Sequence, residues 1–273
     1  MHIVRWTGFA FVLLSLALLI AACAPAAAPA TPTAPPVAEQ PQATEQPAKI
    51  KIKVGMNAEY RPFEYVDESG NIVGFDVDLI KALAERAGFE VELINTKWDG
   101  IFTALAAGEF DVVCSAATIT EERQQTVDFT DPYFNAGQSI AVLESNTEIK
   151  GLEDLKGKRI GVQLGTTGDI EASKIEGAEV KRYEEITLAF QALANGDVDA
   201  VINDAPTSAA IIKANPELKA KLVGEPFTNE FYGIAVNKNK PEIRDALNKA
   251  LAEIKADGTY DRIYQKWFGT GGD

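Results

Sequence analysis

Histidine and cysteine are scarce in this chain, with one histidine and two cysteines among 273 residues. His2 and Cys23 both lie near the N-terminus, so the rest of the chain holds no histidine and only one cysteine, Cys114. This excludes a Ser-His or Cys-His catalytic pair and a zinc site of the usual His/Cys type. Cys114 stands in an apolar segment without a cysteine partner, so we expect it to pack as a small hydrophobic side chain. We predict neither a metal nor a cofactor.

Basic residues are also in deficit, since 26 lysines and arginines stand against 40 aspartates and glutamates. The formal net charge is −14, and removal of Arg5 with an N-terminal leader would make the mature chain slightly more negative. A surface of this sign repels polyanions, which argues against nucleic acid as a partner. The charge balance by itself does not identify a ligand.

Long apolar runs are missing beyond the first residues of the chain. Residues 9–20 are apolar, follow Arg5, and are too short to serve comfortably as a transmembrane helix. They lead into the sequence IAAC, which ends at Cys23 and is typical of a lipoprotein signal. We therefore expect residues 1–22 to be removed as a signal peptide and Cys23 to carry lipid. The alternative is an ordinary secretory signal that happens to contain a cysteine.

Residues 23–49 follow as a segment rich in alanine, proline and threonine. They show no apolar periodicity, and such a composition cannot bury a core. We expect an extended, disordered tether that holds the folded body away from a membrane. The folded body is then expected to begin at residue 50.

From residue 50 to residue 268 the chain alternates between strand-like and helix-like segments. We assign strands to β-rich apolar stretches, and helices to segments where apolar residues recur every three or four positions. The expected strands are residues 50–56, 91–96, 111–115, 158–163, 180–183 and 199–202, and the expected helical segments are 76–87, 98–107, 170–175, 187–194 and 241–268. This alternation predicts an α/β fold of wound sheets flanked by helices.

Two segments repeat each other and indicate two lobes built on one plan. Residues 104–113 read ALAAGEFDVV and residues 192–201 read ALANGDVDAV, with glycine, an acid, an apolar residue and aspartate in the same order. Residues 137–142 and 231–236 are also alike, and we interpret them as the two hinge crossovers between the lobes. The predicted first lobe comprises 50–138 and 235–273, and the predicted second lobe comprises 139–234.

The segment 116–123, AATITEER, is the strongest candidate for a binding site. It follows a buried strand and has the threonines and acids of a helix N-terminus. Ligands of open α/β sheets bind at the carboxyl ends of such strands. Backbone donors, the Thr118 hydroxyl and the Arg123 guanidinium together suit a carboxylate. The alternative is that Arg123 pairs with Glu121 or Glu122 on a solvated helix.

Loops after the other strands are expected to face this segment across a cleft. A carboxylate receptor, aromatic side chains and a lone aspartate together suit a zwitterion, with Arg123 at its carboxylate and Asp204 at its ammonium group. The candidate residues are Asn57, Glu59, Tyr60, Trp98, Ala116, Thr118, Arg123, Gln163, Thr166, Thr167, Asn203 and Asp204. In the alternative reading Asp204 only caps a helix, and Tyr60 and Trp98 are core aromatics.

The body resembles a known family over about residues 49–268. The motifs that carry the resemblance are PFEY (62–65), GFDVDL (74–79), TITEER (118–123), VDFTDPY (127–133), LKGKRIGVQLGTTG (155–168) and DGTYDRIYQKWFG (257–269). On these motifs the chain is similar to family 3 of the extracellular solute-binding proteins, which serve ABC importers of polar amino acids. The resemblance implies a type II periplasmic-binding-protein fold with two hinge crossovers.

The resemblance also assigns roles to the candidate residues. It implies that Arg123 and Thr118 hold the ligand carboxylate and that Asp204 receives the α-ammonium group. Thr166 and Thr167 match the facing loop, and Tyr60 and Trp98 match the aromatic walls of the site. Asn57 stands where many members have aspartate, and Asn203 stands where a glutamine-binding member has histidine. Glu59, together with the sequence GVQLGTTG, favours arginine, lysine or histidine as ligand, with glutamine or another neutral polar amino acid as the alternative.

The implied function is a lipid-anchored receptor that binds one L-amino acid. It would deliver this ligand to a membrane permease that works with an ATPase. We expect a monomer, located outside the cytoplasm in the periplasm or on the cell surface, and not an enzyme. The enzymatic alternative is a dehydratase with Glu59 or Glu230 as general acid. A sensor module of a signalling protein is a third hypothesis.

Overall fold

The computed structural model describes residues 50–269. The signal peptide predicted at 1–22, the lipidation of Cys23 and the tether predicted at 23–49 lie outside the described residues. Among the helices of the described part, none has both the length and the apolar character that a membrane span requires.

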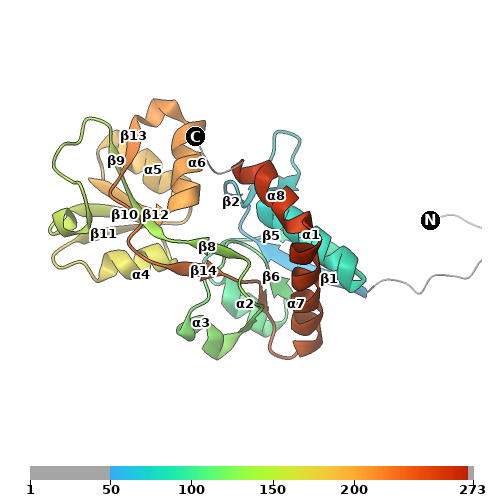
Figure 1. The fold of residues 1–273 in the computed structure, drawn as a ribbon. Helices are drawn as coiled ribbons and strands as arrows, with labels where there is room; N and C mark the ends of the chain where they lie inside the picture. The colour runs from blue at the N-terminus through green and yellow to red at the C-terminus, as the bar shows by residue number, and fades with distance from the viewer. Residues whose placement is uncertain (1–49, 270–273) are drawn as a thin grey trace, which may run out of the picture. The chain divides into compact units, whose positions relative to one another are not determined.

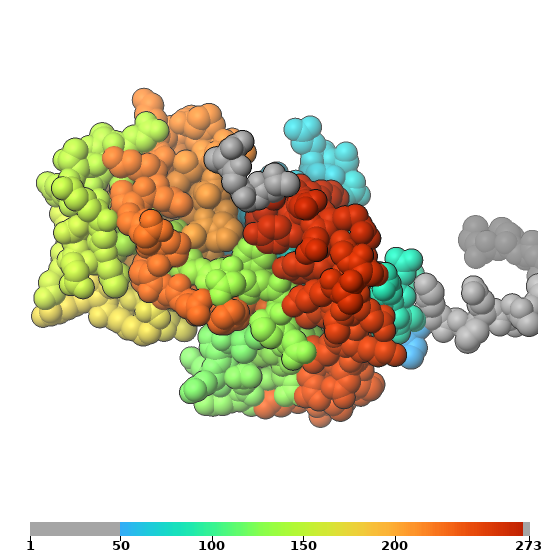
Figure 2. Space-filling view, viewed as in Figure 1, coloured from blue at the N-terminus to red at the C-terminus, as the bar shows by residue number. Residues whose placement is uncertain are grey.

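A five-stranded sheet forms the centre of what we call the first lobe (Figure 1). Its strands, in order across the sheet, are β5 (Phe89–Asn95), β1 (Ile50–Met56), β6 (Val112–Val113), β15 (Ala235–Val236) and β7 (Asp128–Phe129). β1 runs parallel to β5 and β6, while β15 is antiparallel to both of its neighbours. The helices of this lobe are α1 (Phe75–Ala87), α2 (Ile101–Ala107), α3 (Glu121–Thr126), α7 (Pro241–Ala256) and α8 (Thr259–Phe268). In the space-filling view α7 and α8, drawn in red, cover one side of this lobe (Figure 2).

A second five-stranded sheet, the centre of the second lobe, repeats this plan. Its order is β11 (Glu179–Tyr183), β10 (Arg159–Gln163), β12 (Ala200–Asp204), β9 (Gln138–Leu143) and β13 (Ala220–Val223). β10 is parallel to β11 and β12, and β9 is antiparallel to β12 and β13. Its helical segments are α4 (Thr167–Ser173), α5 (Ile186–Asn195), α6 (Ala205–Ala214) and the short 3₁₀ turns η1 (Leu152–Leu155) and η2 (Pro216–Leu218). The prediction of a two-lobed α/β fold is therefore confirmed.

The chain passes between the lobes through a small two-stranded sheet. β8 (Phe134–Ala136) pairs antiparallel with β14 (Glu230–Tyr232), and both are drawn between the two large sheets in Figure 1. The crossover expected at residues 137–142 is instead mostly strand β9, which belongs to the second sheet. A crossing strand and a buried sheet strand are both short and β-rich, so the pattern alone placed the first crossover one strand too late.

An aromatic cluster fixes the crossing strands to the first lobe. Phe63 lies 5.0 Å from Phe134 and 5.2 Å from Tyr232 between ring centroids, both in edge-to-face geometry. Phe268, at the end of α8, lies 5.0 Å from the Phe134 ring. Phe63, Phe75 and Tyr232 are completely buried. Burial of these aromatic rings stabilises the packing of the crossing strands against the first lobe.

The small sheet of β2 (Glu59–Tyr60), β3 (Glu64–Val66) and β4 (Ile72–Val73) places two side chains that matter for the site. Successive side chains of a strand point to opposite faces. In β2, Glu59 is accordingly exposed and Tyr60 is buried. Tyr60 pairs with Glu64 in β3, and Glu64 is also buried.

Helix α3, which carries Arg123, is capped as its sequence predicts. The Thr120 side-chain oxygen accepts a hydrogen bond from the backbone N–H of Arg123, at 3.1 Å between the two heavy atoms. Replacing Thr120 with alanine leaves this donor without its cap, and we expect the free energy of unfolding to fall by about 1 kcal/mol in urea denaturation. Thr126→Ala, an exposed change in the last turn of the same helix, is the control. Equal stability of both variants would contradict a stabilising cap.

Candidate functional site

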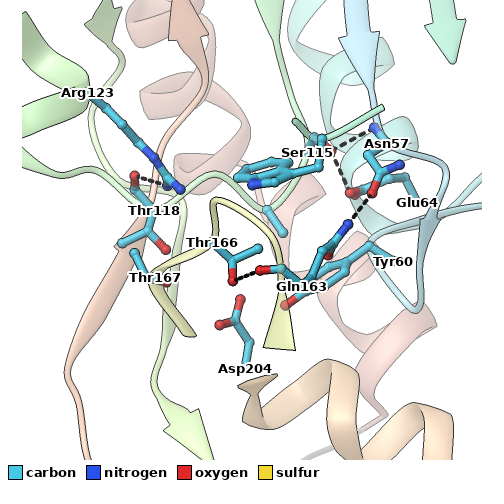
Figure 3. Close-up of a pocket in the computed structure, with 12 residues that line it drawn as sticks. Asn57, Tyr60, Glu64, Ser115, Thr118, Arg123, Gln163, Thr166, Thr167 and Asp204 are labelled. Atoms are coloured by element: carbon cyan, nitrogen blue, oxygen red, sulfur yellow. Dashed lines mark hydrogen bonds between the residues drawn. The ribbon is translucent and has the colours of Figure 1, made fainter. Parts of the chain in front are cut away.

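A polar cavity is lined by residues of both lobes (Figure 3). The cavity and its mouth enclose about 310 Å³, and the lining residues are Asn57, Tyr60, Glu64, Trp98, Ser115, Ala116, Thr118, Arg123, Gln163, Thr166, Thr167 and Asp204. The structure thus brings together ten of the twelve predicted residues. Glu59 and Asn203 do not line the cavity, and Glu64 and Ser115 are lining residues that the sequence analysis missed.

The Arg123 guanidinium is held between the two lobes. Its Nη1 donates to the Thr118 carbonyl oxygen at 2.8 Å, and its Nη2 donates to the carbonyl oxygen of Gly165 in the second lobe at 3.4 Å. It also lies over the rings of Trp98 and Phe102, at 5.2 and 4.6 Å from their centroids. These contacts orient the guanidinium through uncharged groups, two carbonyl oxygens and two aromatic rings.

No carboxylate of residues 50–269 forms an ion pair with Arg123. The alternative in which Arg123 pairs with Glu121 or Glu122 is therefore not found. Burial lowers the pKa of Arg123 to about 10, although Asp204, Glu230 and Glu122 favour the charged form. A partly buried cation that lacks a salt bridge within this part of the chain favours binding of an external anion.

Asp204 is the complementary acid of the cavity. It ends β12 and precedes α6, but its side chain makes no capping hydrogen bond to that helix, so the capping alternative is not found. Its carboxylate accepts hydrogen bonds from Gln138 Nε2 and from the Tyr232 hydroxyl. Burial, and then the nearby Glu230 charge, raise the pKa of Asp204 to about 6. A buried carboxylate held by neutral donors favours a cationic partner.

Glu230, in crossing strand β14, lies behind two threonines of the cavity. The hydroxyls of Thr118 and Thr167 both donate to Glu230 Oε2, at 2.8 and 2.7 Å, and the Thr228 hydroxyl donates to Oε1 at 2.9 Å. Glu230 does not line the cavity. It orients the threonines of both lobes, so the geometry does not favour it as a general acid.

Within residues 50–269, four hydrogen bonds run directly from one lobe to the other around the cavity. Besides the bond from Arg123, the Tyr60 hydroxyl donates to Asn203 Oδ1 at 2.8 Å, Gln163 Nε2 donates to Asn57 Oδ1 at 3.1 Å, and Trp98 Nε1 donates to the Gly165 carbonyl oxygen at 3.1 Å. Asn203 is thus the partner of a lining residue rather than a lining residue itself. Tyr60 and Trp98 are buried, as core aromatics would be, and also line the cavity.

One predicted residue, Glu59, lies away from the cavity, and two lining residues, Glu64 and Ser115, were missed, in each case for a local reason. Glu59 faces a separate surface hollow with Arg61 and Tyr65, because it alternates with Tyr60 along β2. Glu64 is fully buried and accepts a hydrogen bond from the Ser115 hydroxyl at 2.7 Å. An acid inside the apolar segment Phe63 to Val66 was the available signal for Glu64, and the position of Ser115 at the end of a buried strand was the signal for that residue.

Removing the Tyr60 hydroxyl tests the contribution of these bonds between the lobes. Tyr60→Phe keeps the ring and deletes the hydrogen bond to Asn203, which is worth about 1 kcal/mol. We expect ligand affinity to fall by about fivefold because the conformation with both lobes on the ligand becomes less favourable. Calorimetry measures this, with Tyr65→Phe, a half-buried tyrosine beside Arg61, as the matched control. An unchanged affinity in Tyr60→Phe would contradict the role of this bond.

Two similar lobes, joined by paired crossing strands around a polar cavity, define a two-lobed ligand-binding protein. The sequence matches the family described as bacterial extracellular solute-binding proteins, family 3, over residues 52–270, and the chain belongs to that family.

Individual relatives agree with this assignment. A probable histidine-binding protein of Neisseria gonorrhoeae is 40% identical over 227 residues, covering 81% of this chain and 84% of the relative. The solved structure of an ancestral arginine-binding protein bound to arginine is 50% identical, with a TM-score of 0.78, covering 80% of this chain and 98% of that one. The ancestral amino acid-binding protein AncCDT-1, a precursor of cyclohexadienyl dehydratase, is 42% identical, with a TM-score of 0.73, covering 80% of this chain and 95% of that one.

Proposed function

We propose that this protein is the amino-acid receptor of an ABC importer. It binds one L-amino acid between its lobes, with basic side chains favoured, and delivers the ligand to a permease that works with an ATPase. The single observation that carries the proposal is the presence of Arg123 and Asp204 in one cavity, on opposite lobes, each without an ion pair in residues 50–269.

The two charges match the two ends of an α-amino acid. The guanidinium of Arg123 presents parallel N–H donors, which suit the two oxygens of the ligand carboxylate. Asp204 accepts from the α-ammonium group. Because Arg123 and Asp204 belong to different lobes, a ligand that contacts both stabilises the closed arrangement through a hinge motion at β8 and β14.

The remaining cavity residues are left for the ligand side chain. Asn57, Glu64, Ser115 and Gln163 lie on the side of the cavity away from Arg123 in Figure 3. Their carbonyl, carboxyl and hydroxyl oxygens suit N–H donors, which arginine, lysine and histidine all carry. Relatives named for histidine and arginine binding support this choice. Glutamine, whose amide also donates N–H bonds, is the alternative ligand.

The proposal includes the parts of the chain around the site. The first lobe comprises residues 50–133 with 235–269, the second lobe comprises residues 138–229, and the crossing strands β8 and β14 lie between them. The protein acts as a monomer outside the cytoplasm, anchored to a membrane by lipid on Cys23. Detergent partitioning of the full-length chain tests the anchor, because a lipidated protein enters the detergent phase and an unlipidated one stays in the aqueous phase.

A thermal-shift screen against the twenty amino acids tests the ligand class. A ligand that binds only the folded protein raises its apparent melting temperature by mass action. We expect the largest shifts from arginine, lysine or histidine. Shifts from none of the twenty would contradict the function. A largest shift from glutamine would keep the function and correct the side-chain preference.

A further inference from the structure

Two buried acids, Glu64 and Asp76, form a pair beside the cavity. Both side chains are completely buried, and only Glu64 lines the cavity. Glu64 Oε2 and Asp76 Oδ1 have no N–H or O–H donor among the described residues. The two side chains are neighbours, because the Asp76 N–H donates to the carbonyl oxygen of Phe63 at 2.9 Å, and adjacent residues, Ser115 and Ala116, supply donors to Glu64 Oε1 and Asp76 Oδ2. Two ionised carboxylates that are buried side by side repel each other. One proton shared between Glu64 Oε2 and Asp76 Oδ1 instead gives both oxygens a hydrogen-bond partner.

The other contacts of the pair indicate which carboxyl holds that proton. Asp76 Oδ2 accepts hydrogen bonds from the Ala116 N–H and the Tyr133 hydroxyl, both at 2.7 Å. Among residues of the described part of the chain, Glu64 accepts one such bond, from the Ser115 hydroxyl at 2.7 Å. Two donors stabilise negative charge better than one, so Asp76 keeps the charge and Glu64 carries the proton.

The surroundings of the pair contain acids and neutral groups. Tyr60 and Asp204 line the cavity together with Glu64, while the Tyr133 hydroxyl donates to Asp76 Oδ2 and Cys114 Sγ donates to the Asp76 carbonyl oxygen. No lysine or arginine of residues 50–269 forms an ion pair with either carboxyl. Burial raises the pKa of Asp76 to about 7 and raises the pKa of Glu64 well above its ordinary value. Small changes in nearby charge therefore change the number of bound protons.

We propose that the Glu64–Asp76 pair adjusts its charge to the side chain of the ligand. It releases a proton when a cationic side chain enters the cavity, and it keeps that proton beside a neutral side chain. This inference rests on the proposed function. Through this change of charge, the same cavity binds arginine beside an ionised carboxylate and a neutral amide beside a protonated carboxylic acid. In neither case does a buried charge remain unpaired.

Arginine and citrulline make a matched test, because they have nearly the same shape and differ in side-chain charge. Both carry the α-carboxylate and α-ammonium groups, so protons exchanged at Asp204 cancel in the comparison. Calorimetry of the wild-type protein near pH 7, in buffers of different ionisation enthalpy, counts the protons released by each ligand. We expect arginine to release up to about one proton more than citrulline. The affinity for arginine relative to citrulline should accordingly rise with pH.

Two variants test whether Glu64 is the residue that releases the proton. In Glu64→Gln we expect arginine and citrulline to release nearly the same number of protons on binding. The ratio of their affinities should then depend little on pH. Glu185→Gln is the control, because Glu185 is a half-buried acid near Asn57 whose pKa is raised by burial. It should leave the difference unchanged. Loss of the difference in Glu185→Gln instead of Glu64→Gln would overturn the proposal.

The wild-type measurement decides the proposal even if Glu64→Gln does not fold. Equal proton release by arginine and citrulline, with both ligands bound, overturns the role of the pair and leaves the proposed function intact. Failure of every amino acid to bind overturns both.

Discussion

Replacing Arg123 with alanine is expected to weaken amino-acid binding by at least about 2–3 kcal/mol, or about 30- to 150-fold. The reason is that the guanidinium supplies the positive charge for the ligand carboxylate. Without it, the carboxylate enters a cavity lined by the charged Asp204, with the acid pair of Glu64 and Asp76 beside it, and it leaves water without a cationic partner.

Calorimetry with the preferred amino acid measures this effect. Arg123→Lys keeps the positive charge but loses the two parallel N–H donors of the guanidinium. We therefore expect its affinity to lie between those of the wild type and Arg123→Ala. Arg86→Ala is the control, because Arg86 pairs with Asp257 on the surface, away from the cavity. Wild-type affinity in Arg123→Ala would remove this residue from the site.

Asp204→Asn should have an effect of similar size, at least about 2–3 kcal/mol. The change keeps the shape of the side chain and removes the negative charge that receives the α-ammonium group. Gln138 and Tyr232 are neutral donors to this carboxylate and cannot replace its charge. The second lobe then loses its ionic contact with the ligand, and closure loses part of its driving force.

The raised pKa of Asp204 adds a pH dependence. Its pKa is about 6, above that of an ordinary aspartate, so protons compete with the ligand ammonium from about pH 6 downward. Wild-type affinity should therefore fall as the pH falls through 6, and the asparagine variant should lose this component. Asp245→Asn, an exposed acid paired with Arg244, is the control. An Asp204→Asn protein with wild-type affinity and pH profile would show that the ammonium binds elsewhere.

The large features of the fold were predictable because they depend on local patterns. The strand at β1 and the glycine-ended helices α1, α2 and α5 follow from periodicity and from the residue at each helix end. The repeated sequence at 104–113 and 192–201 marks the same helix-to-strand connection in both lobes, before β6 and before β12. Helix α4 begins at Thr167 instead of residue 170, because Thr166 caps it within a segment that resembled a turn.

The details of the site were less predictable because they depend on partners far apart in the sequence. Asn203 was placed in the site by its position after a strand, but its side chain contacts Tyr60, 143 residues away. The side chains of Glu59 and Tyr60 point to opposite faces of β2, and only the pairing of β2 with β3 shows which of them faces inward. Glu64 gave no sign of its partner Asp76, because an acid in a short strand is usually solvent-exposed.

A crystal structure with bound L-arginine would test the central claim most directly. We predict that the α-carboxylate contacts the Arg123 guanidinium, that the α-ammonium group contacts Asp204, and that the side chain points toward Asn57 and Glu64. A ligand bound outside this cavity, or one whose carboxylate and ammonium groups contact neither Arg123 nor Asp204, would contradict the account.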